Sequence, residues 1–189
     1  MAVNTTTKAL LPLTPLSSLR VSRHQIPAHG LIPNTSIQSK PLIIYHNVFT
    51  DPSLTTSAIE GHINAVGVCR PMWHYPMYPE DHFHTTAHEF LVIWRGRARL
   101  NFGGRECGGA VIVELGRGDA ILIPGGVSHA LVEDLEGGFE MIGSYAVDAD
   151  HWDMCYGKAG EEEHIAGIKN LPWFTRDPLY GDNGPATQS

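Results

Sequence analysis

The sequence HFHTTAHE at residues 82–89 brings three histidines and one glutamate into a short stretch of chain. A second segment, GDAILIPGGVSH at residues 118–129, predicts a strand, a tight turn and another strand that starts at His129. Imidazole nitrogens and carboxylate oxygens are the ligands that hold zinc, iron, manganese or nickel with positions left open for a substrate. The two segments together predict a metal site inside a small β-barrel.

The spacing of these residues suggests how they could meet at one ion. Residues two apart on a strand face the same side, so His82 and His84 can bind the same metal. Glu89 follows a short turn at residues 85–87 and can arrive from the neighbouring antiparallel strand. His129, after the turn at residues 124–126, would complete the set. We therefore predict that His82, His84, Glu89 and His129 bind one divalent transition metal, which could be Fe, Zn, Mn or Ni.

The candidate catalytic residues are His88, Glu89 and Tyr78, because a group within hydrogen-bond reach of a bound substrate can move a proton. His88 has several interpretations that the sequence leaves open. It could be a fifth ligand, a substitute for one of the four, an acid/base group beside the ion, or a histidine that faces away from His84. Tyr78 could line the pocket, and so could His74, His151 and Trp152, although half-buried packing is the simpler account of each.

Short apolar segments separated by glycine and proline predict an all-β fold, with strands spaced as in an antiparallel sandwich or barrel. The predicted strands cover residues 21–27, 40–49, 66–73, 89–94, 97–102, 110–115, 120–124, 128–132 and 139–147. Residues 89–94 and 97–102 are expected to form a hairpin whose second strand has one solvated face. A helix is expected over 51–67 with Asp51 as its cap, and a short one near 161–168.

Alternation along the strands predicts which apolar side chains point into the barrel. They are expected to give a pocket for a mostly carbon-based ligand, since small-molecule sites are largely apolar. The predicted inward residues are Leu91, Ile93, Leu100, Phe102, Ile121, Ile123 and Met141.

Length and composition predict a single domain at residues 23–189, preceded by an N-terminal arm at residues 1–22. The arm faintly resembles an organelle transit peptide, although an extended leader is the simpler interpretation. A net charge of −7 argues against nucleic acid or an acidic membrane surface as a partner. The three cysteines form no CxxC pair, which favours reduced thiols in a cytoplasmic protein.

The spacing of the two segments resembles the two motifs of the cupin superfamily. His82, His84, Glu89 and Gly96 match the first motif, and the second matches at Gly118, Pro124, Gly126 and His129. Pro76 and Glu133 depart from the usual Gly and Asn, at backbone or rim positions that leave the ligand assignment unchanged.

The segments at 29–34, 84–89 and 177–185 are similar to the small, single-domain YjlB-like cupins of bacteria and fungi. This resemblance extends over residues 24 to 185 and implies a double-stranded β-helix, or jelly-roll barrel, with a few short peripheral helices. It also implies a homodimer with one divalent metal in the barrel mouth. It implies no reaction, because cupins include dioxygenases, decarboxylases, isomerases, lyases and plain binding proteins.

The leading hypothesis is a metal-dependent enzyme of dioxygenase type. Its substrate would be a small oxygenated organic molecule that chelates the metal. One alternative is an isomerase, lyase or decarboxylase that uses the ion as a Lewis acid. The others are a binding or sensing cupin without turnover, and a barrel whose metal only stabilises the fold.

Overall fold

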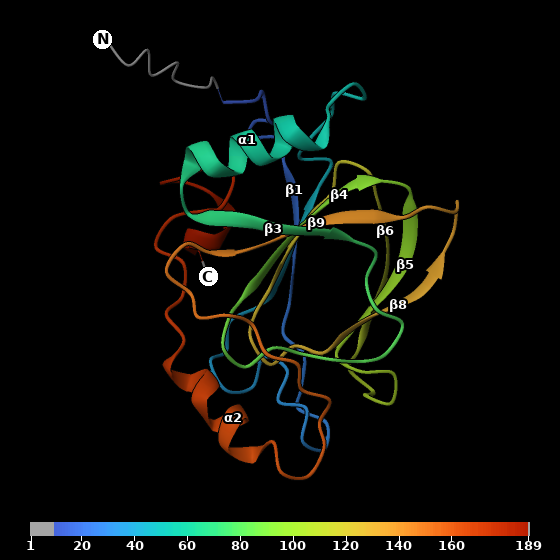
Figure 1. Cartoon of the computed structure of the whole chain (residues 1–189), viewed down its shortest axis with the longest axis vertical. Coiled ribbons are helices and arrows are strands. Elements are labelled where there is room, and N and C mark those ends of the chain that lie inside the picture. Colours follow the sequence, from blue (N-terminus) through green and yellow to red (C-terminus); the bar gives the residue numbers. More distant parts are fainter. Residues whose placement is uncertain (1–9, 189) are drawn as a thin grey trace.

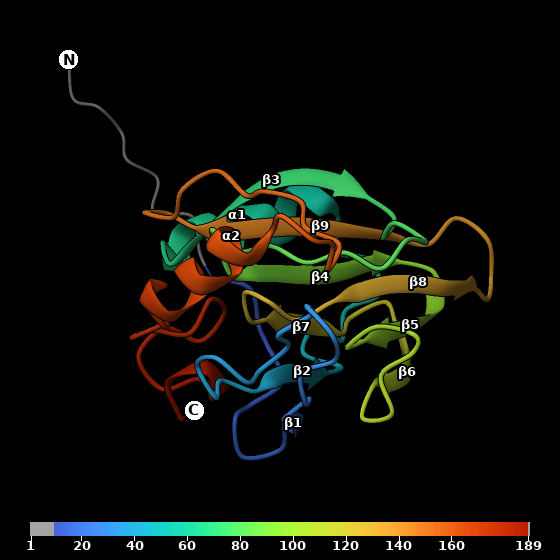
Figure 2. The same cartoon turned by 90° about the horizontal axis from the view of Figure 1, so that it is seen from below.

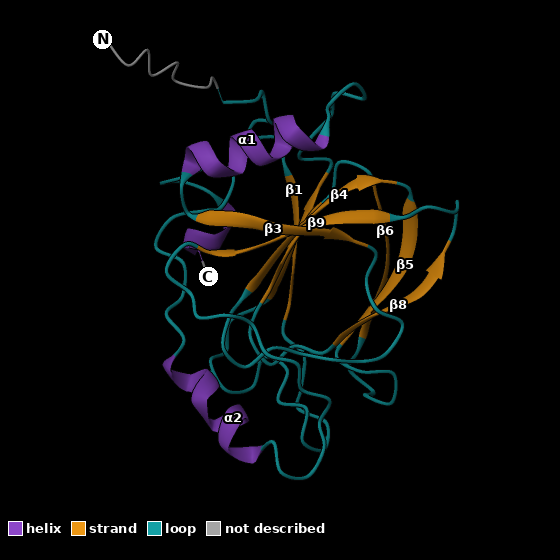
Figure 3. Cartoon of the chain, viewed as in Figure 1, coloured by secondary structure: helices purple, strands orange, loops and turns teal. Residues whose placement is uncertain are grey.

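The structure is a computed structural model of the chain, in which residues 10–188 are described. Two antiparallel sheets lie face to face, as Figures 1 and 2 show from two directions. One sheet has six strands in the order β1-β2-β7-β4-β9-β3, and the other has three in the order β6-β5-β8. Loops and turns connect these strands and few helices are present (Figure 3). The predicted jelly-roll barrel is therefore confirmed.

The strands are short, and most lie within one or two residues of their predicted limits. They are β1 Arg20–His24, β2 Leu42–His46, β3 Cys69–Tyr75, β4 Glu89–Arg95, β5 Arg97–Phe102, β6 Val111–Gly116, β7 Ala120–Ile123, β8 His129–Asp134 and β9 Glu140–Ala146. The helices are α1 Thr56–Val66 and α2 Glu162–Gly167, with 3-10 turns η1 Ile168–Asn170 and η2 Pro185–Gln188.

The space between the two sheets is filled by apolar side chains. All seven residues predicted to point inward belong to this inner core and are almost completely buried, among them Leu91, Phe102 and Met141. Burying one such side chain stabilises the fold by about 1.5–3 kcal/mol. The sequence alternation thus correctly identified the inside of the barrel.

The outer face of the six-stranded sheet is also buried. Tyr45, Phe90 and Leu122 point to this side, where α1 and the C-terminal segment contribute Ile59 and Phe174 to a second apolar cluster. This explains why residues 42–45 of β2 form a continuous apolar run with no polar alternation.

The structure corrects the predicted hairpin. β4 pairs with β7 and β9, whereas β5 pairs with β6 and β8, so β4 and β5 belong to different sheets. Between them Gly96 has φ of +76°, and a Cβ on it would lie 2.9 Å from the Cα of Phe139. The close approach leaves no room for a side chain at the crossing point. The solvated face of β5 is nevertheless present, since Arg99 forms ion pairs with Glu114 and Glu133.

Helix α1 begins later than predicted. Its N-cap is Thr55, whose side chain accepts a hydrogen bond from the Ala58 amide at 3.2 Å. Asp51 is not the cap, because its carboxylate accepts from the amide and hydroxyl of Ser53 in a local turn. The helix ends as expected, with Gly67 in the left-handed conformation at φ of +73°.

The described part of the predicted arm lies against the domain. Leu11 and Leu13 pack on the outer apolar cluster, and the amide of Thr14 donates to the Val48 carbonyl at 3.0 Å. Positions 1–9 fall outside the described residues, and the division into arm and domain stays a prediction. Within residues 10–188, none of the helices combines the length and apolar character that crossing a membrane requires.

Candidate metal centre

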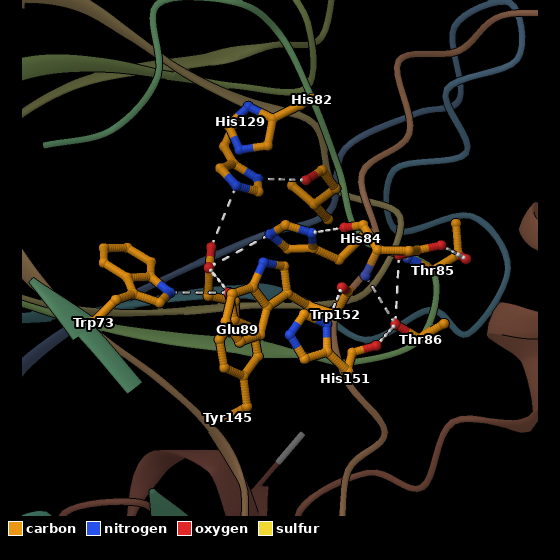
Figure 4. A network of polar contacts seen from close by, with 12 residues as sticks. Trp73, His82, His84, Thr85, Thr86, Glu89, His129, Tyr145, His151 and Trp152 are labelled. Atoms are coloured by element: carbon orange, nitrogen blue, oxygen red, sulfur yellow. Dashed lines mark hydrogen bonds and ion pairs between the residues drawn. The ribbon is translucent and has the colours of Figure 1, made fainter. Parts of the chain in front are cut away.

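The predicted ligands converge at one open end of the barrel (Figure 4). His82 and His84 lie on the extended segment before β4, Glu89 starts β4 and His129 starts β8. Two backbone hydrogen bonds join His82 to His129, with the His129 amide donating at 2.9 Å. One ring nitrogen from each of the three histidines lies within 4.8 Å of the others, and all three residues are buried.

The outer ring nitrogen of each histidine is held by a backbone carbonyl. Nδ1 of His82 contacts the Glu80 oxygen at 2.9 Å, that of His84 the Asp153 oxygen and that of His129 the Val127 oxygen at 3.0 Å. A carbonyl can only accept, so each Nδ1 carries the proton and each Nε2 presents a lone pair. This is the arrangement that orients histidines as metal ligands.

Glu89 closes the set from below in Figure 4. Its two oxygens lie 3.4 Å from Nε2 of His84 and 3.2 Å from Nε2 of His129. Lone pairs on carboxylate and imidazole repel each other unless a positive charge lies between them. The site therefore requires protons or a metal cation at this position.

The electrostatics agree with that requirement. Burial alone would raise the pKa of Glu89, but the neighbouring His84 and His129 hold the pKa of this carboxyl well below its usual range. Burial acts to lower the pKa of His84, and Glu89 outweighs it, so this pKa is raised. Burial, assisted by His129, lowers the pKa of His82 to about 3, which keeps that ring neutral. The neutral ring of His82 and the anionic carboxylate of Glu89 fit a divalent transition metal, and such a cation would take the place of the proton that Glu89 favours on His84.

Tyr145 completes the site and was missed from the sequence. Its hydroxyl donates to Oε1 of Glu89 at 2.5 Å, and Nε1 of Trp73 donates to the same hydroxyl at 3.3 Å. Burial and the charge of Glu89 raise the pKa of Tyr145, so it remains a phenol. Tyr145 lies opposite Glu89 in the pairing of β9 with β4. Only the correct strand pairing would have identified it.

The segment at residues 148–155 is tied to the histidine motif. Besides its carbonyl contact with His84, Asp153 accepts hydrogen bonds from the amide of Thr85 at 2.6 Å and from its hydroxyl. This places Trp152 over the site, with its ring stacked on Tyr145 at 4.6 Å between centroids and 4° between planes. The segment therefore both holds the proposed ligand His84 and forms one wall of the site.

A cavity of about 250 Å³ opens beside the cluster. Tyr78 lies at its edge, half-exposed, with its ring centre 5.5 Å from that of His82. Of the predicted inward residues, Leu91 and Met141 line the cavity. The full lining consists of Trp73, His74, Tyr75, Pro76, Met77, Tyr78, His82, His84, Glu89, Leu91, His129, Met141, Tyr145, Trp152 and Met154.

His88 lies apart from this cluster. Its Nδ1 accepts a hydrogen bond from the Gly125 amide at 2.9 Å, and its ring packs edge-on against Trp173 at 4.9 Å. It lines a different cavity, of about 610 Å³, that the C-terminal segment bounds. The side chains of neighbouring residues point to opposite faces at the start of β4, so placing Glu89 inside directs His88 outward. The structure gives His88 no place among the ligands.

Comparisons with known proteins agree with the fold and the motifs. The model of the AraC-like ligand binding domain matches residues 65–146, which include both histidine segments. The protein YjlB of Bacillus subtilis (strain 168) is 32% identical over 160 residues, which cover 84% of this chain and 90% of that protein. The chain belongs to the YjlB family of cupins. This cupin therefore shares most of its length with its relative.

Solved structures of other proteins resemble this cupin in fold alone. Procruciferin, an 11S globulin of Brassica napus, has a TM-score of 0.36 and 11% identity over 61% of this chain and 22% of its own. Oxalate decarboxylase of Bacillus subtilis has a TM-score of 0.33 and 17% identity over 61% of this chain and 22% of its own. This cupin thus spans about a fifth of the length of each.

Proposed function

We propose that this cupin is a metal-dependent enzyme of dioxygenase type that acts on a small oxygenated organic molecule able to chelate the metal. The observation that carries the proposal is the buried cluster of His82, His84 and His129 beside a cavity, with Nε2 of His84 and of His129 facing the Glu89 carboxylate. In this proposal His82, His84, Glu89 and His129 are the ligands of one divalent ion. A bound ion would supply Lewis acidity and, in the case of iron, the redox chemistry of dioxygen.

The chain's own residues have distinct tasks in this proposal. Tyr145 orients the Glu89 carboxylate by donating to Oε1, and the backbone carbonyls at Nδ1 keep the imidazoles turned inward. Trp152 and Met154 line the cavity, where their apolar side chains would disfavour water beside a bound molecule. Tyr78 places a hydroxyl at the mouth, where it can exchange a proton with a bound molecule.

The absence of His88 from the cavity favours oxygenolysis over an isomerase, lyase or decarboxylase. Those reactions need a base beside the substrate that is strong enough to remove a proton from it. Of the titratable groups that line the cavity, Glu89 is engaged by Tyr145 and His74 contacts Glu60 at 2.7 Å. A tyrosine hydroxyl such as that of Tyr78, a weaker base than a carboxylate or a neutral imidazole, is left to exchange a proton. A binding cupin without turnover is the second candidate, and it is favoured by the match to a family of ligand-binding domains.

Metal analysis and oxygen uptake test the proposal. The purified protein is expected to contain about one equivalent of transition metal by elemental analysis. After chelation and anaerobic reloading with Fe(II), Mn(II), Zn(II) or Ni(II), a panel of enediols and hydroxy ketones should cause oxygen uptake in the iron form. Ligand binding without oxygen uptake or product in any metal form would reject the enzyme and favour the binding cupin.

A further inference from the structure

We infer that the ligand of this site is a singly charged oxygen chelator with one compact aromatic ring, and that doubly charged chelators are disfavoured. The inference rests on the proposed function, because it needs the metal. It is carried by two properties of the cavity, its charge balance and its walls.

The charge balance follows from the residues around the ion. Three neutral imidazoles and one carboxylate would leave a divalent ion with a net charge of +1. A monoanionic chelator neutralises this charge, whereas a dianion leaves an uncompensated negative charge in a buried site, which is costly.

Among the described residues, the cavity lining includes no lysine or arginine that could balance a second negative charge. His74 lines the cavity, but any positive charge on its ring is already balanced by Glu60, whose Oε1 lies 2.7 Å from Nε2. The remaining side chains of the lining are uncharged aromatic, thioether and apolar groups, apart from the proposed ligands themselves. A dianionic molecule would therefore meet only the ion as a positive partner.

The walls favour an aromatic ring. Trp73, Tyr145 and Trp152 surround Glu89 in Figure 4, and Met77, Met141 and Met154 contribute thioethers to the same lining. Thioether sulfur and aromatic edges both interact favourably with aromatic rings.

The aromatic walls are also fixed in place before a ligand binds. Trp152 is stacked on Tyr145, and Trp73 fills the space over Gly143, where a Cβ would lie 2.0 Å from its ring. The volume of about 250 Å³ lies below the roughly 300–1,000 Å³ of drug-sized sites, so one ring is the expected size.

Three chelating probes separate the effect of the ligand's charge from the effect of its aromatic ring. The full-length protein is loaded with Co(II), and binding is followed by its visible absorption. Benzohydroxamate is a monoanion with a ring, acetohydroxamate is the same chelate without the ring, and oxalate is a dianion. Each affinity is divided by the probe's affinity for aqueous Co(II), so that only the contribution of the protein remains.

Benzohydroxamate is expected to be favoured over acetohydroxamate by at least about tenfold, from the burial of its ring. Oxalate is expected to be the weakest of the three. Trp152→Leu should lower the affinity for benzohydroxamate and leave acetohydroxamate within about twofold. Oxalate equal to or tighter than acetohydroxamate after this correction would overturn the charge argument, and equal affinities of the two hydroxamates would overturn the ring argument.

A charge placed on the wall provides a second test. Met154 lines the cavity and is 37% exposed, so Met154→Arg adds a cation at the rim without burying it. It should raise the affinity for oxalate by at least about tenfold, as expected for a charge pair near a protein surface. Ile112→Arg makes the same charge change on β6, at a residue that is 62% exposed and outside the lining, and should change this affinity less than twofold. If Met154→Arg fails to fold, Tyr75→Arg repeats the test at another half-exposed residue of the lining.

The outcomes separate this inference from the proposed function. Failure to bind Co(II), or no change of its spectrum with any probe, would reject both. Probes that bind in the wrong order, or a rim arginine that has no more effect than the control, would reject the inference alone.

Discussion

At the scale of single residues, each side chain of the site is held in place by a hydrogen bond to another group of the chain. Each histidine of the cluster has its Nδ1 on a backbone carbonyl, and Glu89 accepts from Tyr145. The ligand types and their spacing could be predicted from the sequence, because they occur in two short segments. Tyr145 could not, because its contact depends on how β9 pairs with β4.

Exchange of single histidines tests the ligand set. His84→Ala and His129→Ala should each lose most of the bound metal, because each removes a buried Nε2 donor. His88→Ala should retain it, since His88 packs against Trp173 and outside the cluster. The metal content is measured by elemental analysis, and near-complete loss in the His88 variant would require a different ligand set.

Tyr145→Phe tests the support of Glu89. Removing the hydroxyl leaves the carboxylate without its donor at 2.5 Å, so we expect metal affinity to fall by about 10–100-fold. Affinity is measured by competition with a coloured chelator. Tyr156→Phe, at a residue outside the cavity lining, is the control. Equal affinities of the two variants would mean that Tyr145 only packs.

At the scale of elements, the strands were predicted well because they are short apolar segments bounded by glycine, proline and other turn residues. Their pairing was not, and the wrong hairpin at residues 89–102 shows why. A short turn at Gly96 is compatible with both a hairpin and a crossing between sheets, and only packing against Phe139 decides between them. The predicted start of α1 was wrong, because Asp51 and Thr55 are both residue types that cap helices well. In the structure the Asp51 carboxylate accepts hydrogen bonds from Ser53, and Thr55 caps the helix.

The two capping candidates predict different losses of stability. Thr55→Ala should lower the free energy of unfolding by about 1 kcal/mol, because the Ala58 amide loses its acceptor. Asp51→Ala should cost less, since its partners belong to an exposed turn. Denaturant unfolding of both variants measures the difference, and a larger loss at Asp51 would contradict the observed cap.

A buried histidine of α1 predicts that stability depends on pH. Nδ1 of His62 accepts from the Leu11 amide at 3.0 Å, and its Nε2 contacts the Leu179 carbonyl at 2.9 Å. Burial lowers the pKa of His62 below its ordinary value. Below about pH 6.5 the unfolded chain therefore binds more protons than the folded one, and stability falls as the pH drops toward the folded pKa.

This pH dependence is measured by urea unfolding at pH 7.5 and pH 5.5. His62→Gln should show a smaller loss between the two conditions than the unaltered protein, because the titrating ring is gone. The difference between the two proteins isolates His62 from the other buried histidines. An equal loss in both would show that His62 does not contribute.

At the scale of the whole molecule, the C-terminal segment is held by one buried carboxylate. Asp177 accepts from the hydroxyl of Tyr45 at 2.8 Å and from the amides of Leu179, Tyr180 and Ala186. No strand or helix was predicted over these residues, because such a network has no periodicity. The homodimer also stays a prediction, and sedimentation equilibrium of the full chain tests it.

The two ends of the barrel are joined in different ways. At one end the backbone itself crosses from the large sheet to the small one through Gly96. At the other end the sheets approach each other where Glu89 begins β4 and His129 begins β8. The chain also passes from β7 to β8 at this end, through residues 124–128, so a bound ion would add a removable cross-link to a covalent one, and stripping it should loosen the barrel on the substrate side.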